Sequence, residues 1–162
     1  MLILDVDGVL TDGGISMDEK GRESKCFSVR DGTAAALWRR AGLRLAIISG
    51  RKARVVEYRA REMGVVSLYQ NCLRKLEPYQ EIKKKYRLTD REIAYIGDDL
   101  HDISIMKRVG LAIAVADAVE DVFPFVHLVT TSPGGRGAVR EVVELILKAK
   151  GMWREVTDRY YE

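Results

Sequence analysis

The sequence has few amides and few cysteines. Asparagine and glutamine occur only at Asn71, Gln70 and Gln80, beside many Glu, Lys and Arg residues, a bias that is typical of proteins from hot environments. The two cysteines, Cys26 and Cys72, are far apart in unrelated contexts. Because they form neither a metal knuckle nor a secreted disulfide framework, we expect a reducing, cytoplasmic location.

Long apolar runs and clustered charges are also missing. No apolar stretch approaches the length that crosses a membrane, and the beginning of the chain carries acids, unlike a signal peptide. The net charge is only +3, and the basic residues are spread along the chain. Nucleic-acid-binding proteins more often gather their basic residues on one face. We therefore expect a protein that binds neither membranes nor nucleic acids.

Short apolar runs alternate with helix-length segments. The runs lie at residues 2–6, 44–49, 92–97, 110–116 and 127–130, and they are continuous rather than alternating, as in strands covered on both faces. Segments 31–42, 52–64, 77–87, 99–110 and 137–151 have helical periodicity, and most of them end at glycine. This alternation predicts an α/β fold with a Rossmann-like, doubly wound and mostly parallel sheet.

One segment interrupts the alternation. Residues 13–29 hold two short extended runs around the turn sequence DEKG, which predicts a β-hairpin that projects beyond the sheet. No room remains for a cap domain, so we expect a single domain over residues 1–150. In the tail, residues 151–162, Trp153, Tyr160 and Tyr161 have no obvious place in that core. We expect this tail to dock on a neighbouring subunit, and the alternative is a disordered end.

Polar residues follow successive predicted strands. They are the acids of DVDG (residues 5–8), the segment SGR (49–51), Lys75, and the acids of GDDLHD (97–102). Each piece alone is typical of a helix cap or a solvated side chain. Ligands of such sheets bind beyond the carboxyl ends of the strands, where all four pieces would meet. Their joint occurrence therefore predicts an active site.

This constellation resembles the haloacid dehalogenase-like (HAD) superfamily of phosphotransferases over the whole chain. The resemblance implies that Asp5 is the nucleophile and forms an aspartyl-phosphate, while Asp7 serves as general acid and then as general base. It implies a Mg²⁺ ion bound by Asp5, by the backbone carbonyl of Asp7 and by Asp98. A divalent cation suits this chemistry because a carboxylate nucleophile and a phosphate dianion repel each other.

The same resemblance implies supporting roles. Ser49 would hold a phosphoryl oxygen, and Lys75 would neutralise charge on the nucleophile and on the phosphoryl group. Asp99 and Asp102 would bind metal waters or orient Lys75. Family members without the second acid of DVDG act on other leaving groups, so Asp7 favours phosphoryl transfer to water.

Five motifs narrow the resemblance. They are DVDGVLTDGGI, FSVRDGTA, ISGR, YIGDDLHD and GGRGAVREVVELIL, and together they resemble the family of 3-deoxy-D-manno-octulosonate 8-phosphate phosphatases. This capless branch implies a role in lipopolysaccharide sugar synthesis and a homotetramer in which a hairpin or tail closes the neighbour's site. Two alternatives stay open: a phosphatase for sialic-type sugar 9-phosphates or for many sugar phosphates, and a non-catalytic domain that binds a partner.

The substrate implied by this resemblance carries a carboxylate, which needs a cation because an unpaired buried charge is costly. Arg51, Arg59 and Arg136 are the candidates, and Arg51 favours the eight-carbon over the nine-carbon acid. Simple solvation is the alternative for Arg59, and a plain loop is the alternative for Arg136. Thr11 and Gly50 complete the predicted substrate-binding set. The cysteines and both histidines, including His101, are interpreted as structural.

Overall fold

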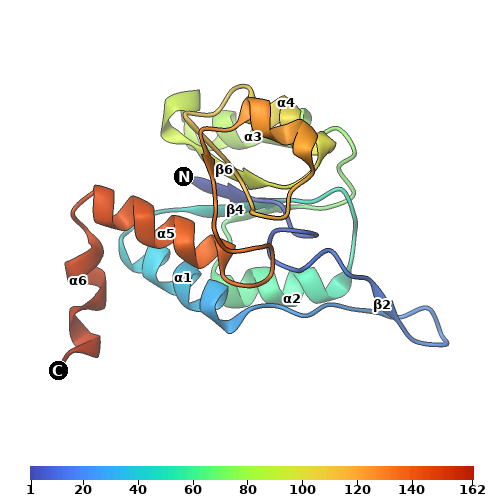
Figure 1. Ribbon diagram of the computed structural model, residues 1–162, viewed down its shortest axis with the longest axis horizontal. Coiled ribbons are helices and arrows are strands. Elements are labelled where there is room, and N and C mark those ends of the chain that lie inside the picture. Colours follow the sequence, from blue (N-terminus) through green and yellow to red (C-terminus); the bar gives the residue numbers. More distant parts are fainter.

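The computed structural model describes residues 1–162 as a six-stranded sheet between two layers of helices (Figure 1). The strand order is β5-β4-β1-β6-β7-β8, and every neighbouring pair is parallel. The strands are β1 (Leu2–Leu4), β4 (Leu45–Ile48), β5 (Ser67–Tyr69), β6 (Ala94–Gly97), β7 (Leu111–Ala114) and β8 (Leu128–Val129). The predicted α/β fold with a parallel sheet is confirmed.

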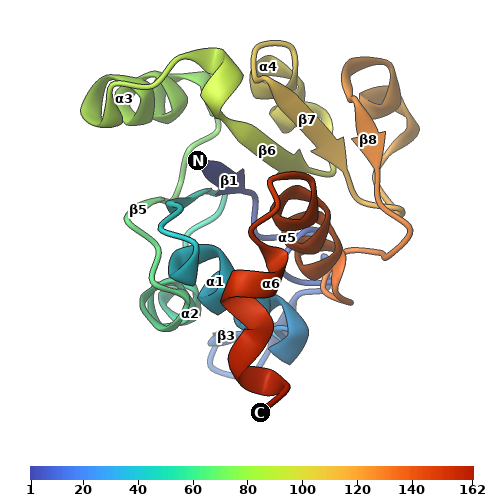
Figure 2. The same cartoon turned by 90° about the vertical axis from the view of Figure 1, so that its left-hand side faces the viewer.

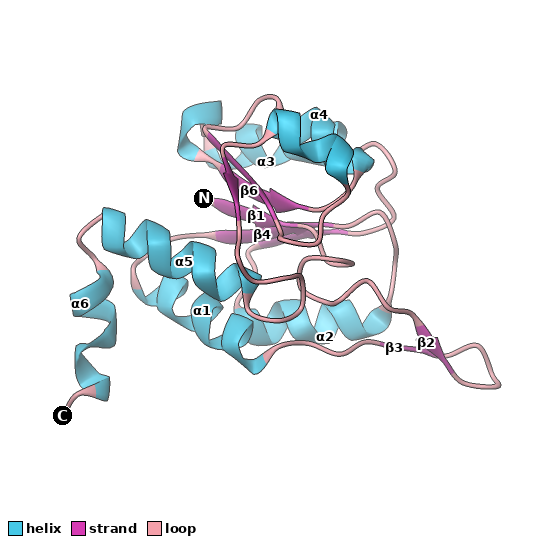
Figure 3. Ribbon diagram, viewed as in Figure 1, coloured by secondary structure: helices cyan, strands magenta, loops and turns pink.

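The helices cover both faces of the sheet (Figure 3). On one face lie α1 (Val29–Arg40), α2 (Arg54–Met63) and α5 (Ala138–Ala149), and on the other lie α3 (Leu76–Tyr86) and α4 (Ile103–Met106). The chain also forms short 3-10 helices: η1 (Asp90–Glu92), η2 (Leu100–Asp102), η3 (Glu120–Phe125) and η4 (Asp158–Tyr160). None of the helices has the length and apolar character needed to span a bilayer.

The two-sided cover explains the continuous apolar runs. In β1, Leu2 and Leu4 belong to the apolar cluster under α1, α2 and α5, whereas Ile3 belongs to the cluster under α3 and α4. Successive side chains of a strand point to opposite faces, so each residue of a doubly covered strand must be apolar. All three side chains are fully buried.

The five predicted strands lie within their predicted runs, but β5 was not predicted. Its three residues, Ser67–Tyr69, lie at the edge of the sheet and include a serine, so they form no apolar run. The predicted helix over 99–110 is also shorter than expected. Its chain forms η2 first and then only four residues of α4.

The predicted hairpin is present as β2 (Ser16–Met17) paired antiparallel with β3 (Glu23–Ser24). It projects past the carboxyl ends of the sheet strands, on the right of Figure 1. The last helix, α6 (Trp153–Thr157), lies at the opposite end of the molecule.

The tail is helical, and its first part packs on its own chain (Figure 2). Trp153 contacts the main core and lies under Arg140 and Lys148, so the expectation that it has no place in the core was wrong. The backbone oxygen of Val156 accepts a hydrogen bond from the Arg40 guanidinium at 2.5 Å. The aromatic rings at the end of the tail, Tyr160 and Tyr161, stay exposed.

Replacing Trp153 with alanine tests this packing. We expect Trp153→Ala to lower the free energy of unfolding by about 2 kcal/mol, because a partly buried indole loses its contacts. Tyr161→Ala is the control, since that ring is 69% exposed and should change stability little. Urea denaturation of the three proteins measures the difference, and equal stabilities would contradict the packing.

Candidate active site

A cavity of about 190 Å³ opens at the carboxyl ends of β1, β4 and β6, beyond the edge of the sheet. It is lined by Asp5, Asp7, Gly50, Arg51, Leu73, Lys75, Asp98, Asp99 and His101. The structure therefore brings residues from all four predicted pieces to one place. Eight of the nine lining residues are not hydrophobic, which is unusual for a site at the end of buried strands.

The loop after β1 is shaped to bring two acids close to the β6 loop. The backbone N–H of Asp5 donates to the Ile96 carbonyl at 3.0 Å, and the chain then turns so that Leu10 N–H donates to the Val6 carbonyl at 2.9 Å. Gly8 has φ +85°, and a Cβ there would overlap the carboxylate of Asp98. The glycine of DVDG thus permits both the turn and the approach of the two acidic loops.

Lys75 is the buried cation of the cavity. It is 3% exposed, and its Nζ lies 2.9 Å from Asp5 Oδ1 and 2.7 Å from Asp102 Oδ1. Burial by itself lowers the pKa of Lys75, but the carboxylates of Asp5 and Asp102 raise it above its ordinary value, so the ammonium stays charged. Lys75 was predicted as a site residue from the sequence, although β5, the strand that precedes it, was not predicted.

Asp102 is fully buried and orients its neighbours. Besides contacting Lys75, it accepts a hydrogen bond from the Tyr95 hydroxyl at 2.5 Å. It also accepts hydrogen bonds from the backbone N–H groups of Asp98 and Asp99 at 2.9 and 3.2 Å. All of its lone pairs are engaged in these bonds, so it is better suited to hold Lys75 and the β6 loop than to bind a metal. Orientation of Lys75 was one of the two roles predicted for it.

The donor set fits a hard divalent cation. Carboxylate oxygens of Asp5, Asp98 and Asp102 lie within 4.8 Å of one another, and Asp98 Oδ1 is buried with no hydrogen-bond partner. Oxygen ligands of this kind are the ones that Mg²⁺ prefers. Asp5 and Asp98 are the side chains that would hold the ion, because Asp102 is already satisfied.

The raised pKa values of Asp5 and Asp98 also indicate that this site favours a bound cation. Burial raises the pKa of Asp98 from 3.8 to about 8, and the neighbouring charges of Asp5 and Asp102 add to the effect. Burial likewise raises the pKa of Asp5 to about 6, although Lys75 opposes the shift. Without a metal, these carboxylates are therefore driven toward their neutral forms.

Ser49, Gly50 and Arg51 follow β4. Ser49 is 2% exposed, and its Oγ accepts the backbone N–H of Arg51 at 3.3 Å. Gly50 and Arg51 line the cavity directly. Gly50 and Arg51 thus form part of the cavity wall next to His101, whose ring carbon lies 4.0 Å from the place of a Cβ on Gly50.

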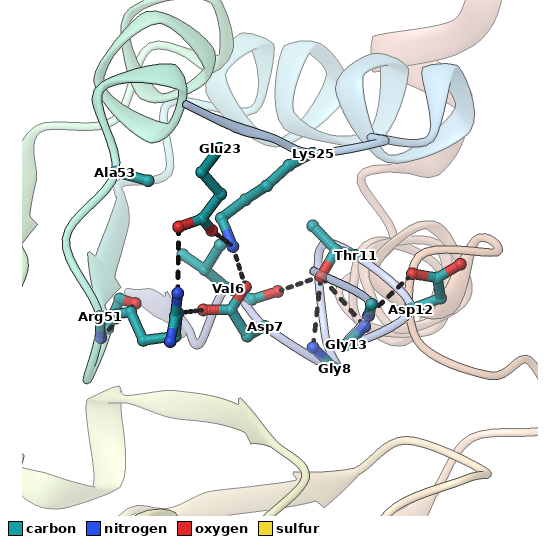
Figure 4. A network of polar contacts seen from close by, with 12 residues as sticks. Val6, Asp7, Gly8, Thr11, Asp12, Gly13, Glu23, Lys25, Arg51 and Ala53 are labelled. Carbon is teal, nitrogen blue, oxygen red and sulfur yellow. Dashed lines mark hydrogen bonds and ion pairs between the residues drawn. The ribbon is translucent and has the colours of Figure 1, made fainter. Parts of the chain in front are cut away.

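Asp7 faces two cations of different origin (Figure 4). Lys25, which follows β3 in the hairpin, donates to Asp7 Oδ1, and Arg51 Nε lies 3.9 Å from Asp7 Oδ2. Glu23 joins both cations, with Oε1 at 2.6 Å from Lys25 Nζ and Oε2 at 3.0 Å from Arg51 Nη2. The hairpin therefore contributes charged groups directly to the site.

Three predicted substrate-binding residues do not line the cavity. Thr11 is 1% exposed, and its hydroxyl serves its own loop by accepting the N–H groups of Gly8 and Gly13. Arg59 donates to the Ser28 carbonyl and to Glu62, both at 2.7 Å, and so ties α2 to the start of α1. Within this chain, Thr11 and Arg59 hold structure together rather than face a ligand.

Arg136 is the third of these residues. Its side chain is 71% exposed, with the guanidinium 3.8 Å from Asp12 Oδ2. The loop that carries it packs on the loop after β1, since Gly135 N–H donates to the Val9 carbonyl at 2.9 Å. Arg136 itself points to solvent.

Sequence reasoning missed four participants: Lys25, Tyr95, Leu73 and His101. Tyr95 carried a signal, because a tyrosine inside a buried strand needs a partner for its hydroxyl. Nothing in the sequence around Lys25 or Leu73 indicated a role in the site. Each lies outside the motifs and is brought to the site only by the fold of its loop. His101 lines the cavity and was interpreted as structural.

Comparison with known proteins gives consistent matches. Residues 52–142 match the family described as haloacid dehalogenase-like hydrolase. The chain is 47% identical over 151 residues to the 3-deoxy-D-manno-octulosonate 8-phosphate phosphatase of Salmonella typhi, covering 93% of this chain and 80% of that protein. It is 46% identical to the protein of the same name from Escherichia coli K12, with the same coverage.

Solved structures of proteins with the same name are also similar to this chain. The 3-deoxy-D-manno-octulosonate 8-phosphate phosphatase of Yersinia pestis superposes with a TM-score of 0.92 at 46% identity, covering 94% of this chain and 82% of that one. The enzyme of the same name from Moraxella catarrhalis, in complex with a magnesium ion, a phosphate ion and a KDO molecule, gives a TM-score of 0.95 at 38% identity. That match covers 98% of this chain and 91% of the other.

The raised pKa of Asp98 predicts a pH-dependent stability of the metal-free protein. The unfolded chain releases this proton near pH 3.8 and the folded chain near pH 8, so the folded state holds the extra proton between these values. The free energy of unfolding in chelator should therefore fall as pH rises from about 4 to about 8. Thermal unfolding across this range in EDTA measures the fall.

Mg²⁺ and one variant provide the controls. Saturating Mg²⁺ should make the fall shallower, because the ion binds the ionised carboxylates of the folded state only. Asp98→Asn should also make it shallower in chelator and should abolish the stabilisation by Mg²⁺. A slope that is the same in wild type and Asp98→Asn would show that Asp98 does not carry the effect.

Proposed function

The chain belongs to the haloacid dehalogenase-like hydrolase family, and on that premise we propose that it is a Mg²⁺-dependent phosphatase for 3-deoxy-D-manno-octulosonate 8-phosphate. The supporting observation is that Asp5, Asp7, Lys75 and Asp98 line one cavity in a chain 47% identical to such an enzyme. The reaction is a step in lipopolysaccharide sugar synthesis. The two alternatives, a sialic-type or broad sugar phosphatase and a non-catalytic domain, find no support in the comparisons.

In the first step, a carboxylate oxygen of Asp5 forms a bond to phosphorus while the bond from phosphorus to the sugar oxygen breaks. Asp7 gives its proton to that oxygen, so the sugar leaves as an alcohol and an aspartyl-phosphate remains. Lys75, at 2.9 Å from Asp5, fixes the nucleophile and balances the charge that gathers on the phosphoryl group. Bound Mg²⁺ supplies further positive charge, held by Asp5, Asp98 and the backbone carbonyl of Asp7.

In the second step, water attacks phosphorus and gives its proton to Asp7. The bond between phosphorus and the Asp5 oxygen breaks, which releases inorganic phosphate and restores both acids. Ser49 is proposed to hold a phosphoryl oxygen. Asp99 and Asp102 are proposed to bind metal waters and to orient Lys75, respectively, which agrees with the contacts of Asp102.

Arg51 is the proposed partner of the substrate carboxylate. It lines the cavity, and its side chain is 45% exposed at the rim, where the sugar would extend from the buried phosphate site. Gly50 leaves room beside it. Arg59 and Arg136 do not line the cavity of this chain. They could contact only a substrate that is bound in the cavity of a neighbouring subunit.

We further propose a cytoplasmic homotetramer. The hairpin lies at the end of the sheet that holds the cavity, whereas the exposed tip of the tail lies at the other end (Figure 1). A tail that helps to close a site must therefore close that of a neighbour. The hairpin also exposes Ile15 and Met17, which are 47% and 61% accessible, and apolar groups of this kind are favoured at subunit contacts.

A substrate panel tests the function. We expect phosphate release in Mg²⁺ to be selective for the eight-carbon keto-acid phosphate over its nine-carbon relatives, and to stop in EDTA. Asp5→Asn should lower kcat by about 10⁴-fold or more, because the nucleophile is lost. Comparable turnover of many phosphates would leave the chemistry standing and contradict the substrate, whereas no turnover by wild type would contradict both.

Light scattering tests the assembly. We expect a mass about four times that of one chain, and we expect the pair Ile15→Lys and Met17→Lys to lower it because buried lysines at a subunit contact are costly. Lys20→Glu, at the tip of the same hairpin, is the control that should keep the wild-type mass. A wild-type mass equal to one chain would rule out the tetramer.

A further inference from the structure

We propose that Lys25 is a positioning residue for Asp7, which it holds at the cavity wall, ready for proton transfer to the leaving sugar oxygen. This inference rests on the proposed function, in which Asp7 is the general acid. Neither Lys25 nor its partner Glu23 belongs to any motif that identifies the site.

The geometry around Lys25 is specific. Its side chain is 1% exposed although it stems from a projecting hairpin, and its ammonium contacts only two carboxylates, Asp7 and Glu23. Figure 4 shows the ammonium between them, on the side of Asp7 that faces the hairpin. A buried lysine with two charged partners loses its freedom of movement, so it can fix the position of a flexible carboxylate.

Asp7 needs such a partner. Asp5, Asp98 and Asp99 line the same cavity, and the arriving substrate carries a phosphate dianion. Lys25 donates to Oδ1 and so leaves Oδ2 to carry the proton in the first step and to receive one in the second. Without Lys25, the Asp7 side chain would be free to turn toward solvent, away from the reacting bond. Arg51 cannot replace Lys25, because its Nε is 3.9 Å from Asp7 and its end group is held by Glu23.

Glu23 completes the arrangement. It bridges Lys25 and Arg51 through separate oxygens, at 2.6 and 3.0 Å, and so joins the hairpin to the loop after β4. Glu23 does not touch Asp7. It is therefore the matched control: removing its charge disturbs the anchoring of the hairpin but leaves the bond from Lys25 to Asp7.

The competing explanation is that Lys25 only anchors the hairpin. The dependence of the rate on the leaving group separates the two roles. An alkyl phosphate needs a proton on its leaving oxygen, whereas 4-nitrophenyl phosphate releases a stable anion and hardly needs one. Loss of anchoring would lower kcat/KM for both substrates alike, but misplacement of Asp7 would lower kcat/KM mainly for the alkyl phosphate. The ratio kcat/KM reports the first step, whereas the second step, in which Asp7 is the base, is the same for both substrates and affects only kcat.

The experiment measures kcat and KM of wild type, Lys25→Met, Lys25→Arg and Glu23→Gln with three substrates in Mg²⁺. The substrates are 3-deoxy-D-manno-octulosonate 8-phosphate, ribose 5-phosphate and 4-nitrophenyl phosphate. For Lys25→Met we expect kcat/KM on the sugar phosphates to fall about 10- to 100-fold, a part of what a general acid contributes, and kcat/KM on the aryl phosphate to fall less than about 3-fold. Lys25→Arg should recover part of the rate. Glu23→Gln should keep the wild-type ratio between ribose 5-phosphate and 4-nitrophenyl phosphate, neither of which carries a carboxylate for Arg51 to bind.

One result in particular would overturn the proposal. Equal losses of kcat/KM on sugar and aryl phosphates would leave Lys25 as an anchor or a substrate contact. Should Lys25→Met fail to fold, Lys25→Gln, which keeps a hydrogen-bond donor, is judged by the same ratio. Stabilisation by Mg²⁺ in thermal unfolding checks that each variant keeps its metal site.

The proposed function can fail separately. If wild type cleaves ribose 5-phosphate and 4-nitrophenyl phosphate but not the eight-carbon acid, the substrate assignment is wrong and the ribose 5-phosphate ratio still decides the role of Lys25. If wild type cleaves no phosphate ester, both proposals are wrong.

Discussion

The repulsion among carboxylates at one edge of the sheet is the constraint on which the rest of the site depends. Asp5, Asp7 and Asp98 line one small cavity, and burying like charges together costs several kcal/mol for each unpaired ion. The chain supplies two buried lysines against this cost. Lys75 pairs with Asp5 and Asp102, and Lys25 pairs with Asp7 and Glu23. Asp98 alone of the three has no ion-pair partner, which makes it the natural place for a metal ion.

The backbone must allow this crowding. Gly8 lets the loop after β1 lie against the carboxylate of Asp98, and a Cβ on Gly134 would overlap the carbonyl oxygen of Gly8. The three loops that follow β1, β6 and β8 are therefore stacked at contact distance. Hydrogen bonds hold the stack, among them one from the Gly135 N–H to the Val9 carbonyl at 2.9 Å. Small residues at these positions bring charged groups from distant parts of the chain together.

Sequence reasoning reached the parallel sheet and the acidic edge because both leave local signals. Apolar runs mark doubly covered strands, and the first acid of DVDG and the first acid of GDDLHD each directly follow one. It missed β5, whose three residues at the sheet edge form no apolar run. It also did not foresee the contacts of Thr11, Arg59 and Trp153 within this chain, because their partners are fixed only once separate elements pack. Lys25 shows the limit most clearly, since nothing near it in the sequence indicates that the hairpin folds its ammonium onto Asp7.

The depth of the site separates chemistry from selectivity. Asp5, Lys75 and Asp102 are almost fully buried and joined by short ion pairs, so their arrangement tolerates little change. Arg51, Leu73 and His101 lie at the rim, where Leu73 is 76% exposed and makes few demands on the core. Substitutions at Leu73 and His101 can therefore change which sugar is accepted without disturbing the charges that cleave the phosphate. Lys25 and Glu23 connect the buried residues with the rim. Lys25 binds Asp7, the proposed proton donor, while Glu23 holds Arg51 at the rim. The hairpin thus links the position of the proton donor to the group that would meet the substrate's carboxylate.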